Sequence, residues 1–155
     1  MIGTVGSETR IDSTVLGDAV NLASRLESVT KVYGVGIVIS GETYLLLNKP
    51  EQFQCRELDR IRVKGKKEPM GIFEVFDCDP PDIQEMKRKT VGYLLEGLVF
   101  RQIQQWDMAQ NAFEEMLQIN PDDQVAKHHL KYIKQLQLLE LSEEEWDGAI
   151  TLDHK

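Results

Sequence analysis

The sequence predicts an α+β segment followed by an all-helical segment. Short apolar runs rich in β-branched or aromatic residues occur before about residue 79, and helical spacing dominates after it. Between the two lies DCDPPD (residues 77–82), whose adjacent prolines can neither continue a helix nor donate to a central strand ladder. We therefore predict a partial α+β domain over residues 1–78, a linker and helix start over 79–90, and a helical tail over 91–155.

Three runs bounded by turn residues are predicted to be strands: Val35–Ser40, Phe53–Leu58 and Gly71–Phe76. A helix is predicted from Asp18 to about Val32, because apolar residues recur there at three- and four-residue spacing and Gly34 lies where the helix would end. A shorter helix is predicted over Gly41–Leu47.

The tail contains small and aromatic residues at helix–turn–helix spacing. They are Tyr93, Gly97, Phe100, Ala109, Phe113 and Pro121. This spacing resembles one tetratricopeptide unit, with Trp106 near the turn and Asp123–Leu139 as a capping helix. Because about three such repeats are needed for independent stability, we expect the unit to pack on the preceding segment or on a partner protein. A generic helical hairpin is the alternative.

Two features outside the repeat spacing also bear on the tail. His128 and His129 are adjacent, so they point in different directions on a helix and do not form a metal pair. The acidic stretch Glu143–Glu145 and the following Trp146 are interpreted as a surface turn with a candidate anchoring aromatic.

Composition excludes several classes of protein. The chain has 155 residues, 41% hydrophobic and 28% charged, which is too apolar for a disordered tail. Its net charge of −8 argues against general nucleic-acid binding and against a basic membrane-surface protein. Cys55 and Cys78 fit neither a disulfide framework nor a zinc site, so we expect a reducing, cytoplasmic setting. No apolar run approaches the ~18 residues of a transmembrane helix, so we expect no membrane contact from this segment.

The stretch Arg10–Glu27 (RIDSTVLGDAVNLASRLE) carries the most specific pattern. It resembles the class III adenylate/guanylate cyclase catalytic domain, whose pattern reads R-x-D-Y-T-V-x-G-D-x-V-N-x-A-x-R-L-E. The match extends upstream to GTVGS and downstream through VYGVGIVIS, RELD and VKGK, and covers about residues 2–76. The resemblance implies the C-terminal half of a ferredoxin-like domain of the bacterial adenylate cyclase type.

Four residues match the functional positions of that family. Asn21 and Arg25 are four residues apart, so on a helix they share one face. The resemblance implies that Asn21 orients the ribose, Arg25 stabilises the transition state, Thr14 selects the base and Lys64 grips the triphosphate. Thr14 implies ATP rather than GTP as substrate. Ser13 departs from the usual Tyr of the pattern.

The family's metal-binding aspartates and adenine-reading lysine lie upstream of the GTVGS segment, so this sequence does not contain them. Asp12 and Asp18 are not assigned as metal ligands, because Asp18 is better explained as a helix cap and Asp12 lacks an acidic partner. The resemblance therefore implies that Mg²⁺ or Mn²⁺ is bound elsewhere in a longer enzyme, here called the parent. It also implies a site formed with a second cyclase domain, a homodimer being expected.

These considerations predict that the parent converts ATP to 3′,5′-cyclic AMP and pyrophosphate, while the isolated chain makes none. Membrane anchoring, if present, would come from N-terminal domains of the parent. We also expect marginal stability for the isolated segment, because its strands would expose apolar faces and edges unless something covers them. The alternative function is a non-catalytic interaction module built from a decayed cyclase half and the helical hairpin. The retained residue types at the four functional positions favour the enzyme.

Overall fold

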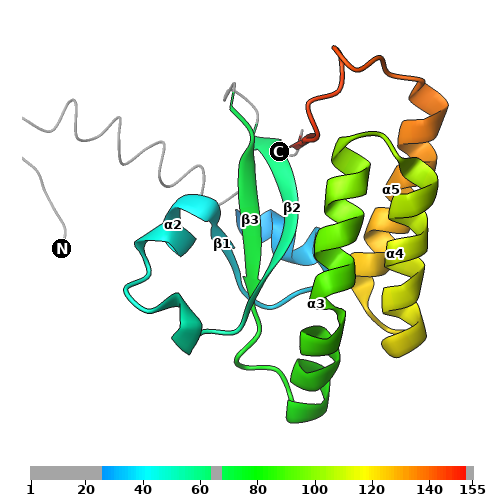
Figure 1. Cartoon of the computed structure of the whole chain (residues 1–155). Coiled ribbons are helices and arrows are strands. Elements are labelled where there is room, and N and C mark those ends of the chain that lie inside the picture. The colour runs from blue at the N-terminus through cyan, green and yellow to red at the C-terminus, as the bar shows by residue number, and fades with distance from the viewer. Residues whose placement is uncertain (1–25, 64–67, 153–155) are drawn as a thin grey trace, which may run out of the picture.

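The computed structural model describes residues 26–63 and 68–152 of the chain. Residues 26–33 are helical and precede a series of named elements. These are β1 (Val38–Ser40), α2 (Gly41–Leu46), the 3₁₀ turn η1 (Pro50–Gln52), β2 (Cys55–Val63), β3 (Met70–Val75), α3 (Pro81–Gln102), α4 (Trp106–Ile119), α5 (Gln124–Leu139) and β4 (Ile150–Leu152). The predicted fold class, an α+β segment followed by helices, is confirmed (Figure 1).

The four strands form one sheet in the order β1-β3-β2-β4. β3 pairs antiparallel with both β1 and β2, whereas β4 pairs parallel with β2. The sequence predicted the first three strands but placed the end of β2 at Leu58, and it did not predict β4. β2 continues to Val63 because its second half, although rich in charged residues, still pairs with β3.

Several element boundaries follow from local chemistry. Gly34, with φ of +67°, ends the helical stretch as predicted, in a backbone conformation that favours glycine. The Ser40 hydroxyl accepts a 3.1 Å hydrogen bond from the Thr43 backbone N–H and caps α2. Pro81 occupies the first turn of α3, and the Asp123 carboxylate caps α5 by accepting from Val125 N–H.

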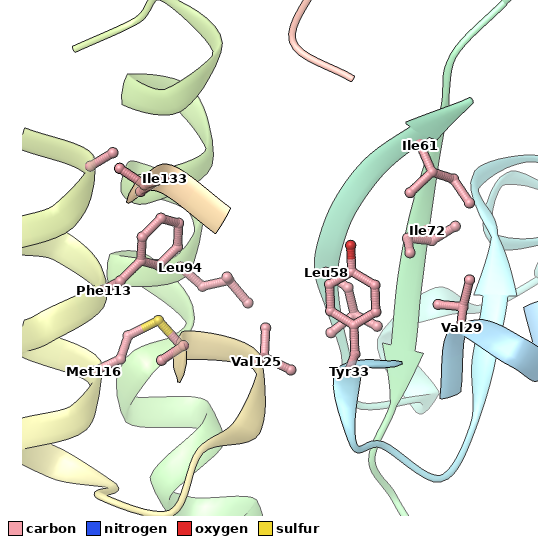
Figure 2. Packing of buried hydrophobic residues seen from close by; sticks show 12 residues of the cluster. Val29, Tyr33, Leu58, Ile61, Ile72, Leu94, Phe113, Met116, Val125 and Ile133 are labelled. Atoms are coloured by element: carbon pink, nitrogen blue, oxygen red, sulfur yellow. The ribbon is translucent and has the colours of Figure 1, made fainter. Parts of the chain in front are cut away.

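The helical tail packs on one face of the sheet, and a single hydrophobic core crosses the predicted boundary near residue 80 (Figures 1 and 2). Its fully buried members before that boundary are Val29, Tyr33, Leu58, Ile61 and Ile72. Those after it are Leu94, Ala109, Phe113, Met116, Val125, Ala126 and Ile133. The prediction that the helical unit packs on the preceding segment is therefore confirmed, while its resemblance to a tetratricopeptide unit stays a prediction.

Part of the other face and one edge of the sheet are also covered. Tyr44 of α2 stacks on Phe73 of β3 with ring centroids 4.4 Å apart. β4 covers the outer edge of β2, so that edge is not left unpaired. Part of the surface expected to be exposed is thus covered by other parts of the chain. Marginal stability remains an expectation.

The segment after α5 returns over the helices to reach the sheet (Figure 1). Trp146, only 9% exposed, donates from Nε1 to the backbone carbonyls of Arg101 and Gln102, both at 3.1 Å. Its ring meets that of Trp106, the first residue of α4, in an edge-on contact at 5.8 Å. The interpretation of Trp146 as an anchor is confirmed, and so is the position of Trp106 at the turn.

The contact between α3 and α4 gives a prediction with a matched control. A Cβ at Gly97 would lie 2.6 Å from the Phe113 ring, whereas a Cβ at Gly92, on the same helix, would meet nothing within 4 Å. We expect Gly97→Ala to lower the free energy of unfolding by about 1–3 kcal/mol through overpacking. Gly92→Ala should raise it by about 0.5–1 kcal/mol through helix propensity. Urea unfolding of both variants tests this, and an equal or greater stability for Gly97→Ala would contradict the packing.

Candidate functional site

The four residues predicted to act on substrate lie outside the described residues. Thr14, Asn21 and Arg25 fall in residues 1–25, and Lys64 falls in residues 64–67. The structure describes the neighbours that follow and precede them, namely the helical stretch 26–33 directly after Arg25 and strand β2 directly before Lys64. What it shows is how these two neighbouring elements are held.

The helical stretch is fixed at its end by Tyr33. This side chain is 1% exposed, and its hydroxyl donates a hydrogen bond to Oδ2 of Asp59 on β2. Val29, one turn earlier, is fully buried in the same core. At the turn that follows, a Cβ on Gly34 would lie 2.8 Å from Cβ of Gln124, so the chain here approaches the start of α5 closely. The helix end is thus anchored to both the sheet and the tail.

A β-bulge directs Asp59 toward the helices. The register of β2 against β3 shifts between Glu57 and Asp59, which leaves Leu58 as an extra residue. In a regular strand, side chains alternate between the two faces of the sheet, so Leu58 and Asp59 would lie on opposite faces; both are nevertheless fully buried. The bulge also turns the Leu58 carbonyl toward the tail, where it accepts a 2.7 Å hydrogen bond from Nε2 of His129.

Asp59 forms a buried ion pair with Arg101 of α3. Nη2 of Arg101 donates to Asp59 Oδ1, and Nη1 donates to Nδ1 of His129 at 3.2 Å. Burial by itself would raise the pKa of Asp59, but the Arg101 charge and the hydrogen bonds from Arg101 and Tyr33 outweigh it and hold that pKa below its usual value. Burial and the Asp59 charge raise the pKa of the Tyr33 phenol, which therefore remains a donor.

His129 belongs to the same group, and its imidazole ring is neutral. Burial lowers its pKa to about 4. Its two partners assign the tautomer, because Nδ1 accepts from Arg101 while Nε2 donates to Leu58. Tyr33, Asp59, Arg101 and His129 together are called the Asp59 cluster below.

A second buried group lies on the same face of the sheet. Glu74 of β3 accepts from Arg56 Nε at 3.1 Å and from Lys87 Nζ at 2.7 Å. Arg56 also donates from Nη1 to Asp123 at 2.9 Å, and Lys87 pairs with Asp79. Strands β2 and β3 are therefore bound by ion pairs to α3 and to the N-terminus of α5.

A cavity of about 260 Å³ lies beside this second group, lined in part by Tyr33, Arg56, Lys87 and Asp123. Arg56 and Lys87, the cations at its wall, already pair with carboxylates, so the cavity offers no excess positive charge to bind the phosphates of a nucleotide. The two clusters are suited to hold elements in place rather than to do chemistry.

The described residues also do not fit the expected metal. Over residues 26–63 and 68–152, no three His, Cys, Asp or Glu side chains are arranged to hold a metal ion. Cys55 and Cys78 are free thiols, the first partly buried and the second exposed. None of the helices in this part of the chain has the length and apolar character required to cross a bilayer.

Sequence reasoning missed the Asp59 cluster, although two signals were available. Leu58 and Asp59 interrupt the alternation of β2, which is a sign of a bulge. Arg101 follows Leu94 and Gly97 at the three- and four-residue spacing of a buried helix face. A charged residue in that position requires a buried partner.

Comparison with known proteins identifies the N-terminal part of the chain. Residues 1–76 match the family described as "Adenylate and Guanylate cyclase catalytic domain". This segment therefore belongs to the class III cyclase catalytic domain family, as the motif Arg10–Glu27 predicted. Catalytic domains of this family generally use Mg²⁺ or Mn²⁺.

Three relatives agree with that assignment. An "Adenylate cyclase" of Anabaena cylindrica is 51% identical over 76 residues, which is 48% of this chain and 15% of that protein. "Adenylate cyclase 1" of Rhizobium meliloti is 36% identical over 75 residues, which is 48% of this chain and 11% of that protein. No solved structure matches the chain.

A third relative extends the similarity into the tail. "Adenylate cyclase, terminal-differentiation specific" of Dictyostelium discoideum is 33% identical over 145 residues, covering 92% of this chain and 7% of that protein. An alignment of that length includes helices beyond residue 76. The chain thus spans less than one sixth of the length of each of these three relatives.

The neutral state of His129 gives a prediction for stability against pH. Its pKa of about 4 in the folded chain lies below the usual value of about 6.5, so between these values the unfolded state binds more protons. Stability is therefore fully present above the usual pKa and falls as pH drops, by about 1.4 kcal/mol per pH unit in that window. Urea unfolding between about pH 7 and pH 5 measures this slope.

His129→Gln should flatten the slope, whatever its effect on stability at neutral pH. His128→Gln is the matched control, because His128 is only partly buried whereas His129 is fully buried, and burial lowers the pKa of both. The His128 variant should keep most of the slope. Equal slopes in the natural chain and in His129→Gln would show that His129 does not titrate as described.

Proposed function

We propose that residues 1–78 supply one face of a class III adenylate cyclase site, which converts ATP to 3′,5′-cyclic AMP and pyrophosphate in a longer parent enzyme. The observation that supports this most directly is the family match over residues 1–76, together with adenylate cyclase relatives up to 51% identical. The proposal places this segment in the cytoplasm, where ATP is available.

The four motif residues have distinct roles in this proposal. Attack of the 3′-hydroxyl on the α-phosphate develops negative charge that a planar, permanently charged guanidinium suits, and this role belongs to Arg25. Asn21 orients the ribose so that its hydroxyl is in line for attack. Thr14 accepts a hydrogen bond from the adenine amino group, and the Lys64 ammonium binds the triphosphate as a compact point charge.

The rest of the site comes from a second cyclase domain, a homodimer being the expected arrangement. Mg²⁺ or Mn²⁺ would supply charge neutralisation on the phosphates, from ligands outside this sequence. The described residues do not fit that metal, and each role given to this chain involves its own side chains alone. Arrangement of the tail as a tetratricopeptide-like unit that recruits a protein partner is part of the same proposal.

Removal of Arg25 tests the assignment. In the parent, Arg25→Ala and Asn21→Ala should each lower kcat by about 100–1000-fold, because each removes a group that stabilises the transition state. Lys31→Ala is the control, since Lys31 is an exposed cation on the following helical stretch and should leave turnover unchanged. Cyclic AMP formation from ATP, measured alongside circular dichroism, separates lost catalysis from lost folding.

The same assay on the 155-residue chain alone should give no product, because the metal-binding aspartates of the family are not in its sequence. A measurable rate from the purified chain, or full activity in Arg25→Ala, would contradict the proposed site. Full activity in Arg25→Ala would favour the alternative function, a non-catalytic interaction module.

A further inference from the structure

We propose that Arg101, in the helical tail, is a positioning residue for the cyclase site: through Asp59 and Tyr33 it holds the helical stretch 26–33 in a fixed orientation against β2. The inference rests on the proposed function, because that helical stretch directly follows Asn21 and Arg25 in the chain. It gives the tail a direct part in shaping catalysis, beyond recruitment of a partner.

The path from the tail to the helix end is two side-chain contacts long. Arg101 donates to one carboxylate oxygen of Asp59, and the other oxygen accepts from the Tyr33 hydroxyl. Asp59 is 0% exposed, while Arg101 and Tyr33 are each 1% exposed, so water cannot replace either contact. A carboxylate bound at both oxygens has a fixed orientation, so it also fixes the position of the Tyr33 hydroxyl that donates to it.

Arg101 is itself fixed from the tail side. Its guanidinium contacts His129 of α5 at 3.2 Å and the carbonyl of Gly148 at 3.3 Å. The Trp146 indole bonds to the backbone carbonyl of Arg101 at 3.1 Å. Two parts of the tail, α5 and the segment 146–148, therefore hold Arg101, and Asp59 links its guanidinium to the helix end at Tyr33.

Tyr33 lies eight residues after Arg25, about two helical turns along the predicted helix. Because the sequence predicts one helix from Asp18 to about Val32, the proposal requires that a rotation at the anchored end displaces the Arg25 guanidinium. A misplacement of about 1 Å can cost about 100-fold in rate. The similarity of the Dictyostelium discoideum adenylate cyclase over 145 residues shows that a similar tail follows a cyclase segment there too.

The test uses the parent enzyme and compares kcat with KM for ATP. Arg101→Gln leaves Asp59 as an uncompensated buried charge, so kcat should fall about 10- to 100-fold while KM changes little. Arg101→Lys keeps the charge but loses the planar fork, and its loss should be smaller. The double variant Asp59→Asn/Arg101→Gln removes the uncompensated charge and should recover part of the lost kcat. If Arg101→Gln fails to fold, the kcat of this double variant tests the inference in its place.

Two controls separate positioning from general stability. Ser40→Ala lowers stability by removing the hydroxyl that caps α2, outside the Asp59 cluster, and Arg88→Gln removes an exposed arginine from α3. When assayed at a temperature well below the unfolding midpoint of every variant, both control variants should retain the kcat of the parent. A loss of kcat in Ser40→Ala that equals the loss in Arg101→Gln would reduce Arg101 to a structural role and overturn the inference.

Hydrogen exchange in the 155-residue chain supplies a readout independent of activity. Amides of residues 27–33 should exchange faster in Arg101→Gln than in Ser40→Ala. Unchanged exchange there, or unchanged kcat in Arg101→Gln, would overturn the inference while leaving the proposed function intact. The proposed function fails separately, if Arg25→Ala keeps its activity.

Discussion

A buried ion pair between Asp59 of β2 and Arg101 of α3 joins the two parts of the chain and lies at the centre of a hydrogen-bonded group. Removing two charges from water costs several kcal/mol per ion, and their attraction offsets this only when the geometry is good and further hydrogen bonds complete it. Tyr33, His129 and the bulge at Leu58 supply those hydrogen bonds. The sheet, the helix end and the tail must therefore adopt compatible positions together.

Much of the fold could be predicted because its signals are local. Gly34 ends a helix through a positive φ, and Trp106 begins α4 directly after a short turn. Asp123 caps α5 where a side-chain oxygen before an amphipathic run predicts a helix start. The family of residues 1–76 could also be identified, because Arg10–Glu27 keeps several residue types at fixed spacing.

The remaining features depend on contacts between residues far apart in sequence. The extension of β2 past Leu58 follows from pairing with β3, which hydrophobic alternation along one strand does not reveal. β4 is three residues long and pairs only once the chain has returned to β2. The burial of Arg101 depends on Asp59, 42 residues away, so sequence spacing could suggest a buried face but not its partner. Thr14, Asn21, Arg25 and Lys64 lie outside the described residues, and their roles stay proposals.

The central claim is that the cyclase segment and the tail fold as one unit joined by the buried charges. Simultaneous measurement of urea unfolding by two probes tests it most directly. The fluorescence of Trp106 and Trp146 reports the tail alone, because both tryptophans of the chain lie there, while hydrogen exchange of β2 and β3 amides reports the sheet. Coincident transitions with one midpoint are expected for a cooperative unit. A tail that loses its tryptophan signal while β2 and β3 keep their protection would contradict the claim.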